Sequence, residues 1–366
     1  MDINSICNTY RRQLYDANYS VETVSYYPDE LKKFLDFVKN KGKEKIDEIN
    51  INDVIEYRNE LSNSYKSTIV RKKMHAIKTW IRMIFELNPS DSHFADLYNK
   101  ISAIRTVMVR KDDKGGYEPI PFEHFIKILE KASNFDIETK LFIYLLFTTG
   151  GRSQFYGIKI GEIDFENKVL NIFVKGEKEA RIPLLNTVMN VLVEHIIKKY
   201  KDEFDKLINR GIDKNEAVKI VVSKHKNDFL FKNGRDVYSK KLSWKELKKN
   251  REANTINAER ILKRVCENTK LWVCNSCNRY GNSSNKCDIC GGKVKYVSYT
   301  PHQVRKALAR YGEKFGLSLE GLQDLLAHSQ IDTTKKYYRG QQDEKVRKEL
   351  EGLEKLIEKL SGTNPY

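Results

Sequence analysis

Arginine, histidine and tyrosine residues gather in a few short segments of this 366-residue chain. An apolar run ends in Thr148-Thr149-Gly150-Gly151-Arg152, and much later the chain reads Thr300-Pro301-His302-Gln303-Val304-Arg305, Leu326-Ala327-His328-Ser329 and Thr333-Thr334-Lys335-Lys336-Tyr337. A tyrosine hydroxyl that attacks a phosphodiester creates negative charge on the non-bridging oxygens. Arginine neutralises that charge with planar, bidentate donors. These residue types together are what transfer of a phosphodiester to tyrosine requires.

The order and spacing of these residues make the pattern more specific than its parts. A lone His-x-x-Arg occurs by chance in many helices, and a Tyr-Tyr pair is commonly core or surface packing. Here Arg152 follows a hydrophobic helix and a Thr-Gly-Gly turn, Pro301 precedes the His-x-x-Arg helix, and His328 stands nine residues before Tyr337. The set resembles the active site of tyrosine recombinases, the integrase and Xer-like family of DNA strand-exchange enzymes.

The resemblance implies a role for each matched residue. Arg152 and Arg305 would clamp the scissile phosphate, His302 would assist proton transfer at the tyrosine, and His328 would hydrogen-bond the phosphate. Tyr337 would be the nucleophile, with Tyr338 as its neighbouring competitor. A free tyrosine has a pKa near 10, so the surrounding cations must help it to ionise.

A predicted β-hairpin supplies one more candidate. Short β-branched runs at Asn167 to Val174 and Ala180 to Leu184 flank Lys175-Gly176-Glu177-Lys178. By resemblance, Lys175 would be the general acid that protonates the departing 5′ oxygen, and Lys178 is the local alternative. No catalytic metal is expected, because arginine and lysine supply the positive charge, and no ATP is expected, because the covalent link conserves the phosphodiester energy.

Two positions depart from the family pattern. Many members carry an acidic side chain three residues after the first catalytic arginine, whereas this chain has Phe155. Ala327 replaces the usual glycine before His328. Neither change removes a residue that would touch the phosphate, but both put the ordering of the neighbouring segments in doubt.

Four of the six cysteines form two Cys-x-x-Cys knuckles at Cys274, Cys277, Cys287 and Cys290. Four thiolates at this spacing suit tetrahedral zinc, so we predict a structural Zn²⁺ ribbon, inserted at about 270–297. A rubredoxin-type iron site and two redox pairs are the alternatives. The insertion would extend the DNA footprint or touch a neighbouring subunit. Cys7 and Cys266 are expected to be ordinary buried thiols.

The charge balance favours a polyanionic partner. There are 66 basic and 50 acidic residues, a formal charge of +16, which is also compatible with a merely lysine-rich solvated surface. In the family, an N-terminal helical domain clamps one side of the duplex. The expected phosphate contacts are Lys72, Lys73 and Lys78 on a helix from Ser67 to Leu87, and Arg110, Lys111 and Lys114 in a basic linker.

The predicted fold is mainly α with a small β-hairpin or sheet. Residues 1–105 would form an all-helical, SAM-like DNA-clamping domain, 106–118 the linker, and 119–345 an α+β catalytic domain carrying the four-cysteine zinc ribbon. Residues 346–366 would form a C-terminal helix and tail, which either packs on its own domain or docks on the next protomer. Other predicted helices span Asn50 to Leu61, Phe122 to Ala132, Ile137 to Thr148, Thr187 to Phe204 and Leu242 to Val265.

The functional expectation is a site-specific recombinase or integrase, acting on double-stranded DNA through a 3′-phosphotyrosyl link. It would be a monomer or dimer when free and a homo-tetramer on synapsed DNA. The longest apolar stretch, Leu141 to Phe147, is too short to span a bilayer, so a cytoplasmic, nucleoid-associated location is expected. The alternatives are a chromosome or plasmid dimer resolvase, a type IB topoisomerase-like enzyme and a non-catalytic DNA-binding factor.

Overall fold

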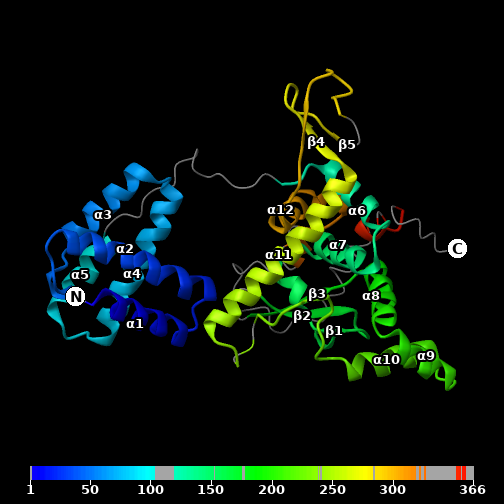
Figure 1. Cartoon of the computed structure of the whole chain (residues 1–366), viewed down its shortest axis with the longest axis horizontal. Helices are drawn as coiled ribbons and strands as arrows, with labels where there is room; N and C mark the ends of the chain where they lie inside the picture. The colour runs from blue at the N-terminus through cyan, green and yellow to red at the C-terminus, as the bar shows by residue number, and fades with distance from the viewer. Residues whose placement is uncertain are drawn as a thin grey trace. The chain divides into compact units, whose positions relative to one another are not determined.

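Helices and small antiparallel sheets make up the computed structural model (Figure 1). It describes residues 2–103, 119–151, 153–174, 178–237, 239, 241–282, 285–318, 321–322, 325–326, 352–355 and 357–359. The chain divides into two compact units, Met1–Gly116 and Tyr117–Tyr366. The mainly helical class with a small hairpin, expected from the sequence, is confirmed.

The first unit contains helices only within its described residues. They are α1 (Ile3–Asp16), α2 (Val21–Asn40), the 3-10 turn η1 (Ile46–Glu48), α3 (Ile51–Ser64), α4 (Ser67–Leu87) and α5 (Ser92–Ala103). Polar side chains cap the starts of the first three α-helices: Asp2 caps α1, Ser20 caps α2, and Asn50 caps α3 in a capping box with Asp53. Tyr10, which is buried, donates its hydroxyl to the Ala76 carbonyl and so ties α1 to α4.

The second unit is built around the buried helix α7 (Ile137–Thr149), with α6 (Phe122–Ala132) and α12 (Pro301–Tyr311) against it. Every residue from Leu141 to Phe147 is buried, which explains the continuous apolar run in the sequence. The remaining helices are α8 (Asn186–Lys199), α9 (Lys201–Asn209), α10 (Lys214–Lys224) and α11 (Trp244–Thr269), with the 3-10 turns η3 (Ser153–Gly157), η4 (Ile160–Glu162) and η5 (Gly312–Phe315). One hydrophobic core joins most of them.

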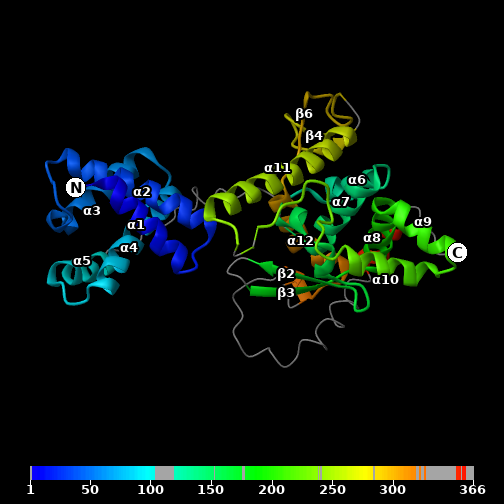
Figure 2. The same ribbon diagram turned by 60° about the horizontal axis from the view of Figure 1, so that its bottom comes forward.

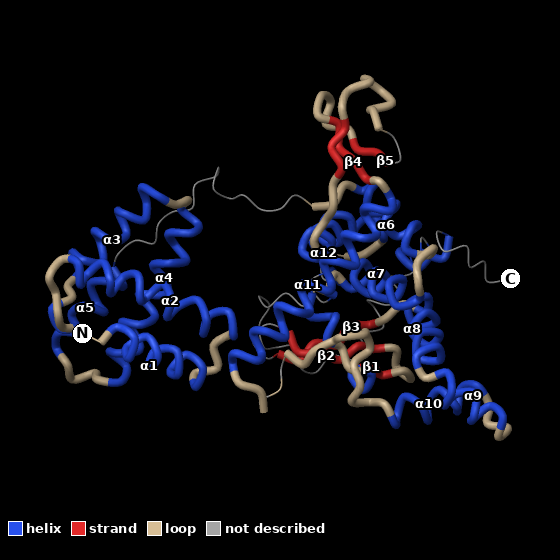
Figure 3. The backbone as a smooth tube through the Cα atoms, in the orientation of Figure 1, coloured by secondary structure: helices blue, strands red, loops and turns tan. Residues whose placement is uncertain are grey.

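Two three-stranded antiparallel sheets belong to this unit (Figure 3). The first has the order β1 (Ile163–Asp164), β2 (Val169–Val174), β3 (Lys178–Pro183), and the pairing of Val174 with Lys178 closes the predicted hairpin. The second has β4 (Leu271–Cys274) between β5 (Tyr280–Asn282) and β6 (Val294–Tyr296). This second sheet projects from the helical body at the end of α11 (Figures 1 and 2).

One of the expected helices needs correction. The single helix expected from Thr187 to Phe204 is two helices, because the backbone leaves the helical region at Tyr200 (φ −117°, ψ 37°). The Tyr200 ring stacks on His225 with centroids 3.8 Å apart, and its hydroxyl donates to Asp228. On α4, Ile69 is 41% exposed, whereas Val70 and Met74 are buried.

The C-terminal segment packs on its own unit where the structure describes it. Residues 352–355 and 357–359 are helical, and Leu353 and Ile357 are buried in the core. The Glu354 carboxylate accepts a hydrogen bond from the Thr187 amide at the start of α8. This part of the chain therefore follows the first of the two alternatives, packing on its own domain, and docking on a neighbouring protomer stays a prediction.

Candidate active site and metal centre

The turn after α7 is the first part of the candidate site. Gly150 ends the helix with φ +60°, a left-handed conformation that costs a residue with a Cβ atom about 1–2 kcal/mol. A Cβ at Gly150 would also lie 2.4 Å from Cδ2 of Leu326. The Gly151 amide donates to the Thr149 hydroxyl at 3.2 Å. The Thr-Thr-Gly-Gly sequence thus makes a tight turn directly before Arg152, which lies outside the described residues.

The unusual Phe155 has a packing role next to this turn. It is buried, and a Cβ atom added to Gly151 would lie 2.4 Å from its ring. The ring therefore rests against the glycine backbone that precedes Arg152. Hydrophobic contact orders the segment at the place where many family members have an acidic side chain.

Helix α12 presents the second part of the site. Thr300 caps it in a capping box with Gln303, and Pro301 occupies its first turn, where no amide donor is needed. Val304, Ala307 and Leu308 face the core, whereas His302 is exposed on the first turn and Arg305 is half-buried. The helix thereby fixes a histidine and an arginine three residues apart at the edge of the unit.

Arg305 joins three segments that are distant in the sequence. Its Nη1 donates to the Gly150 carbonyl at 3.0 Å, and its Nη2 donates to the Leu326 carbonyl. Gly150 stands two residues before Arg152, and Leu326 two residues before His328. The guanidinium is therefore placed where the chain leads into both of those predicted site residues. No spacing in the sequence indicates either contact.

Several predicted site residues lie outside the described part of the chain. They are Arg152, Lys175, His328 and Tyr337 of the candidate catalytic set, and Arg110, Lys111 and Lys114 of the linker. Ala327, which replaces the glycine usual in the family, also lies outside the described residues. Lys175 falls in the turn between β2 and β3, and Lys178 begins β3. Among the described residues, the structure brings together Gly150, Arg305 and Leu326.

Three lysines of α4 were expected to contact phosphate, and their surroundings differ. Lys72 is exposed, with Nζ 4.1 Å from the centre of the Tyr26 ring. Lys78 is half-buried, and this burial lowers its pKa. Lys73 is buried and forms an ion pair with the buried Glu30, because it faces the helix α2. Lys73 is thus an interior residue of the first unit, and we leave it out of the proposed DNA contacts.

The four cysteines of the two knuckles come together at the tip of the second sheet. Their four Sγ atoms lie within 4.8 Å of one another. The distances are 3.5 Å for Cys274 to Cys290 and 3.6 Å for both Cys277 to Cys287 and Cys277 to Cys290. Four sulfurs at about 2.3 Å from a tetrahedral zinc would be about 3.8 Å apart. The cluster is thus of the right size for one metal ion and too open for disulfides.

The two knuckles have matching backbones. Asn278 and Gly291 follow the second cysteine of each and both have positive φ, at 55° and 66°. Their amides donate to the carbonyls of Cys274 and Cys287, at 3.1 and 2.8 Å. Backbone N–H groups, first that of Cys277, lower the pKa of the Cys274 thiol to about 6, and those of Cys290 and Ile289 lower the pKa of Cys287. The pKa values of Cys277 and Cys290 are raised instead, because hydrogen bonds with the neighbouring cysteine sulfurs outweigh the backbone donors of Arg279 and Gly292.

The two remaining cysteines are free and buried, as predicted. Burial raises the pKa of Cys266 to about 12 and also raises that of Cys7. Both thiols are therefore protonated at neutral pH and neither belongs to the cluster. Among the helices that the structure describes, none has the length and apolar character that crossing a membrane requires.

Comparison with known families decides what this arrangement is. The model of the phage integrase family matches residues 120–344, which include both arginine segments, the hairpin and the tyrosine. The chain belongs to the phage integrase family. It is therefore a tyrosine recombinase, an enzyme that cleaves and rejoins DNA in site-specific recombination.

Individual relatives agree with this membership. The recombinase is 25% identical over 221 residues to the tyrosine recombinase XerC of Rickettsia canadensis (strain McKiel), covering 57% of this chain and 70% of that protein. Its fold is similar to that of the integrase of transposon Tn1549 in complex with transposon right end DNA (TM-score 0.50, 15% identity, 93% of this chain and 98% of the other). It is similar also to XerH bound to palindromic difH substrate (TM-score 0.50, 18% identity, 87% and 76%).

Proposed function

We propose that this recombinase breaks and rejoins double-stranded DNA through a 3′-phosphotyrosyl link to Tyr337. The observation that supports the proposal most is the placement of Arg305, whose guanidinium is held by the segments that lead to Arg152 and to His328. A phosphate seated there would meet two arginines, and each preorganised donor is worth about 3 kcal/mol of barrier lowering.

The proton transfers would be divided among the remaining residues. His302, exposed at the start of α12, would assist loss of the Tyr337 proton, and His328 would hydrogen-bond the phosphate. Lys175, in the turn of the β2–β3 hairpin, would protonate the departing 5′ oxygen. The covalent link conserves the energy of the phosphodiester, so the reaction would need no ATP. With cationic side chains at the phosphate, it would need no catalytic metal.

We assign the four-cysteine cluster to a structural Zn²⁺. All four donors are sulfurs, at separations that fit tetrahedral coordination, and four-sulfur sites leave no position for a reactive water. The ion would hold the two knuckles together and would take no part in the phosphate chemistry.

We propose that the enzyme works as a homo-tetramer on two synapsed duplexes in the cytoplasm, as a monomer or dimer when free. Lys72 and Lys78 on α4, and Arg110, Lys111 and Lys114 in the linker, would contact phosphates. Integration of a mobile element is the preferred role. Resolution of chromosome or plasmid dimers is the second candidate, because tyrosine recombinases named XerC are among its relatives.

A nicked suicide duplex, in which the 5′ fragment diffuses away after cleavage, tests the core of the proposal. Tyr337→Phe should bind this DNA normally and form no covalent adduct, whereas Tyr338→Phe should form it at the wild-type rate. Efficient trapping of the Tyr337→Phe protein would show that another residue is the nucleophile. Absence of any adduct in the wild-type protein on a library of sites would favour a non-catalytic DNA-binding factor, and relaxation of supercoils without site preference would favour a topoisomerase.

A further inference from the structure

The chain leaves the cysteine ribbon at β6 and reaches the catalytic helix α12 after four residues, Val297, Ser298, Tyr299 and Thr300. This segment is the direct covalent connection from the ribbon to α12. The segment begins with a hydrogen bond from the Val297 amide to the Leu271 carbonyl of β4, 2.9 Å long. It ends at Thr300, the N-cap of α12. What holds the segment in place therefore bears on His302 and Arg305.

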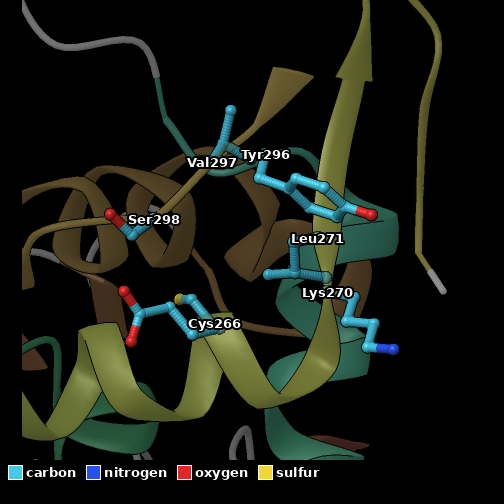
Figure 4. A pocket seen from close by; sticks show the side chains of 7 residues that line it. Cys266, Lys270, Leu271, Tyr296, Val297 and Ser298 are labelled. Atoms are coloured by element: carbon cyan, nitrogen blue, oxygen red, sulfur yellow. The ribbon is translucent and has the colours of Figure 1, made fainter. Parts of the chain in front are cut away.

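Packing holds part of this segment, because Tyr299 is buried in the hydrophobic core and Val297 packs against it. Val297 and Ser298 line a pocket of about 410 Å³, together with Cys266, Glu267 and Lys270 at the end of α11 and Leu271 and Tyr296 of the ribbon (Figure 4). On its side towards the end of α11, the segment therefore borders this pocket and lacks the close contact of an interior.

His124 of α6 adds polar contacts to this segment and to the ribbon. It is 1% exposed, its Nδ1 lies 2.6 Å from the Tyr299 hydroxyl, and its Nε2 lies 3.0 Å from the Gly281 carbonyl of β5. The ring also has an edge contact with Tyr280, at a centroid distance of 5.5 Å. One imidazole thus contacts the catalytic body, the ribbon and the segment between the ribbon and α12.

The partners of His124 determine its tautomer. The Gly281 carbonyl can only accept, so Nε2 carries the proton. In a neutral ring Nδ1 is then the acceptor, and the Tyr299 hydroxyl donates to it. Both ring nitrogens of His124 are therefore satisfied, one as a donor and one as an acceptor. Burial lowers the pKa of His124, which favours the neutral ring.

We propose that His124 is a positioning residue that fastens the cysteine ribbon and the root of α12 to α6, so that the ribbon helps to set His302 and Arg305 for cleavage. The proposal rests on the proposed function. It gives the insertion a role within its own subunit, in place of the two roles considered from the sequence, DNA contact and contact with a neighbouring subunit.

Tyr299→Phe is the sharpest test, because it removes one hydroxyl and keeps the ring. The variant should bind the suicide duplex with unchanged affinity and keep its zinc, yet form the covalent adduct about tenfold more slowly, the effect of one buried hydrogen bond. Amides of residues 299–305 should exchange hydrogen faster. In a His124→Gln background, which keeps a donor towards Gly281, Tyr299→Phe should cause little further change in either measurement.

Tyr280→Phe is the matched control, since it removes a hydroxyl from the same ribbon and leaves the ring contact with His124. It should match the wild type in adduct rate and in exchange. Wild-type cleavage and wild-type exchange in Tyr299→Phe would overturn the proposal, and so would equal additional losses in the His124→Gln background. If no variant forms an adduct because the proposed function is wrong, the exchange measurement still tests the link between His124 and α12.

Discussion

The guanidinium of Arg305 donates a 3.0 Å hydrogen bond to the carbonyl oxygen of Gly150, 155 residues earlier in the chain. The same side chain donates to the Leu326 carbonyl. Two backbone oxygens thus hold an arginine in one orientation before any phosphate is bound. The side chain therefore orders the site and is also the donor proposed for the phosphate.

Arg305→Lys tests whether this orientation matters. Lysine keeps the charge but has no planar fork, so it cannot satisfy both carbonyls and face a phosphate. Adduct formation should fall by at least about 100-fold, while DNA affinity changes little. Arg310→Lys, an exposed site on the same helix, is the control and should cleave normally. An Arg305→Lys protein with near wild-type cleavage would show that charge alone is sufficient.

Gly150→Ala should destabilise the second unit through two separate effects. The left-handed backbone costs about 1–2 kcal/mol, and the new Cβ meets the buried Leu326, which adds to the loss. Gly211 also has positive φ, but nothing lies within 4 Å of a Cβ there. Gly211→Ala should therefore lose only the backbone part. Urea unfolding measures both, and equal losses would mean that the contact with Leu326 is unimportant.

Cys274→Ser should reduce the zinc content, which we expect to be about one ion per chain in the wild type. The melting temperature should fall because the ribbon loses its cross-link. Cys7→Ser changes a cysteine of the first unit that does not belong to the cluster, and this variant should keep its zinc. Elemental analysis and thermal melts check both variants, and metal-free wild-type protein would contradict the assignment.

Stability should fall as the pH drops below about 6.5. Burial lowers the pKa of His195, whose Nε2 lies 2.9 Å from the Leu230 carbonyl, so the folded chain keeps this ring neutral. The unfolded chain binds the proton at about pH 6.5 and below, so acid favours unfolding by up to about 1.4 kcal/mol per pH unit for each such histidine. His195→Gln keeps a donor and should flatten this dependence. Urea titrations between pH 5 and 7.5 measure it, and an unchanged slope would rule out His195 as a source.

Lys72 and Lys73 are neighbours with opposite expected effects. Lys72→Ala should weaken binding to all DNA sequences alike and reduce the salt slope by about one, since one phosphate contact is lost. Lys73→Ala should leave the slope unchanged and lower stability, because the buried Glu30 loses one of its two lysine partners and keeps only Lys33. Binding measured across a salt series separates the two. A reduced slope in Lys73→Ala would show that this side chain reaches DNA after all.

Strong local signals explain which elements could be predicted from the sequence. The helices Ser67–Leu87 and Phe122–Ala132 have the predicted ends, and the hairpin and the cysteine cluster also follow from nearby residues. Contacts between distant segments could not be predicted. Tyr200 interrupts a helical pattern because of His225 and Asp228, and Lys73 looked like part of a basic face until α2 was seen to cover it. The acceptors of Arg305 are backbone carbonyls, which have no residue signature.

The two carbonyls that accept hydrogen bonds from Arg305 are synthesised at different times. One of them, at Gly150, leaves the ribosome long before the arginine, and the other, at Leu326, leaves after it. The guanidinium cannot reach its final orientation until Gly150 and Leu326 are both available to fold together. A nascent or truncated chain that stops before Leu326 therefore lacks one of the two acceptors that orient Arg305, as well as the proposed nucleophile Tyr337.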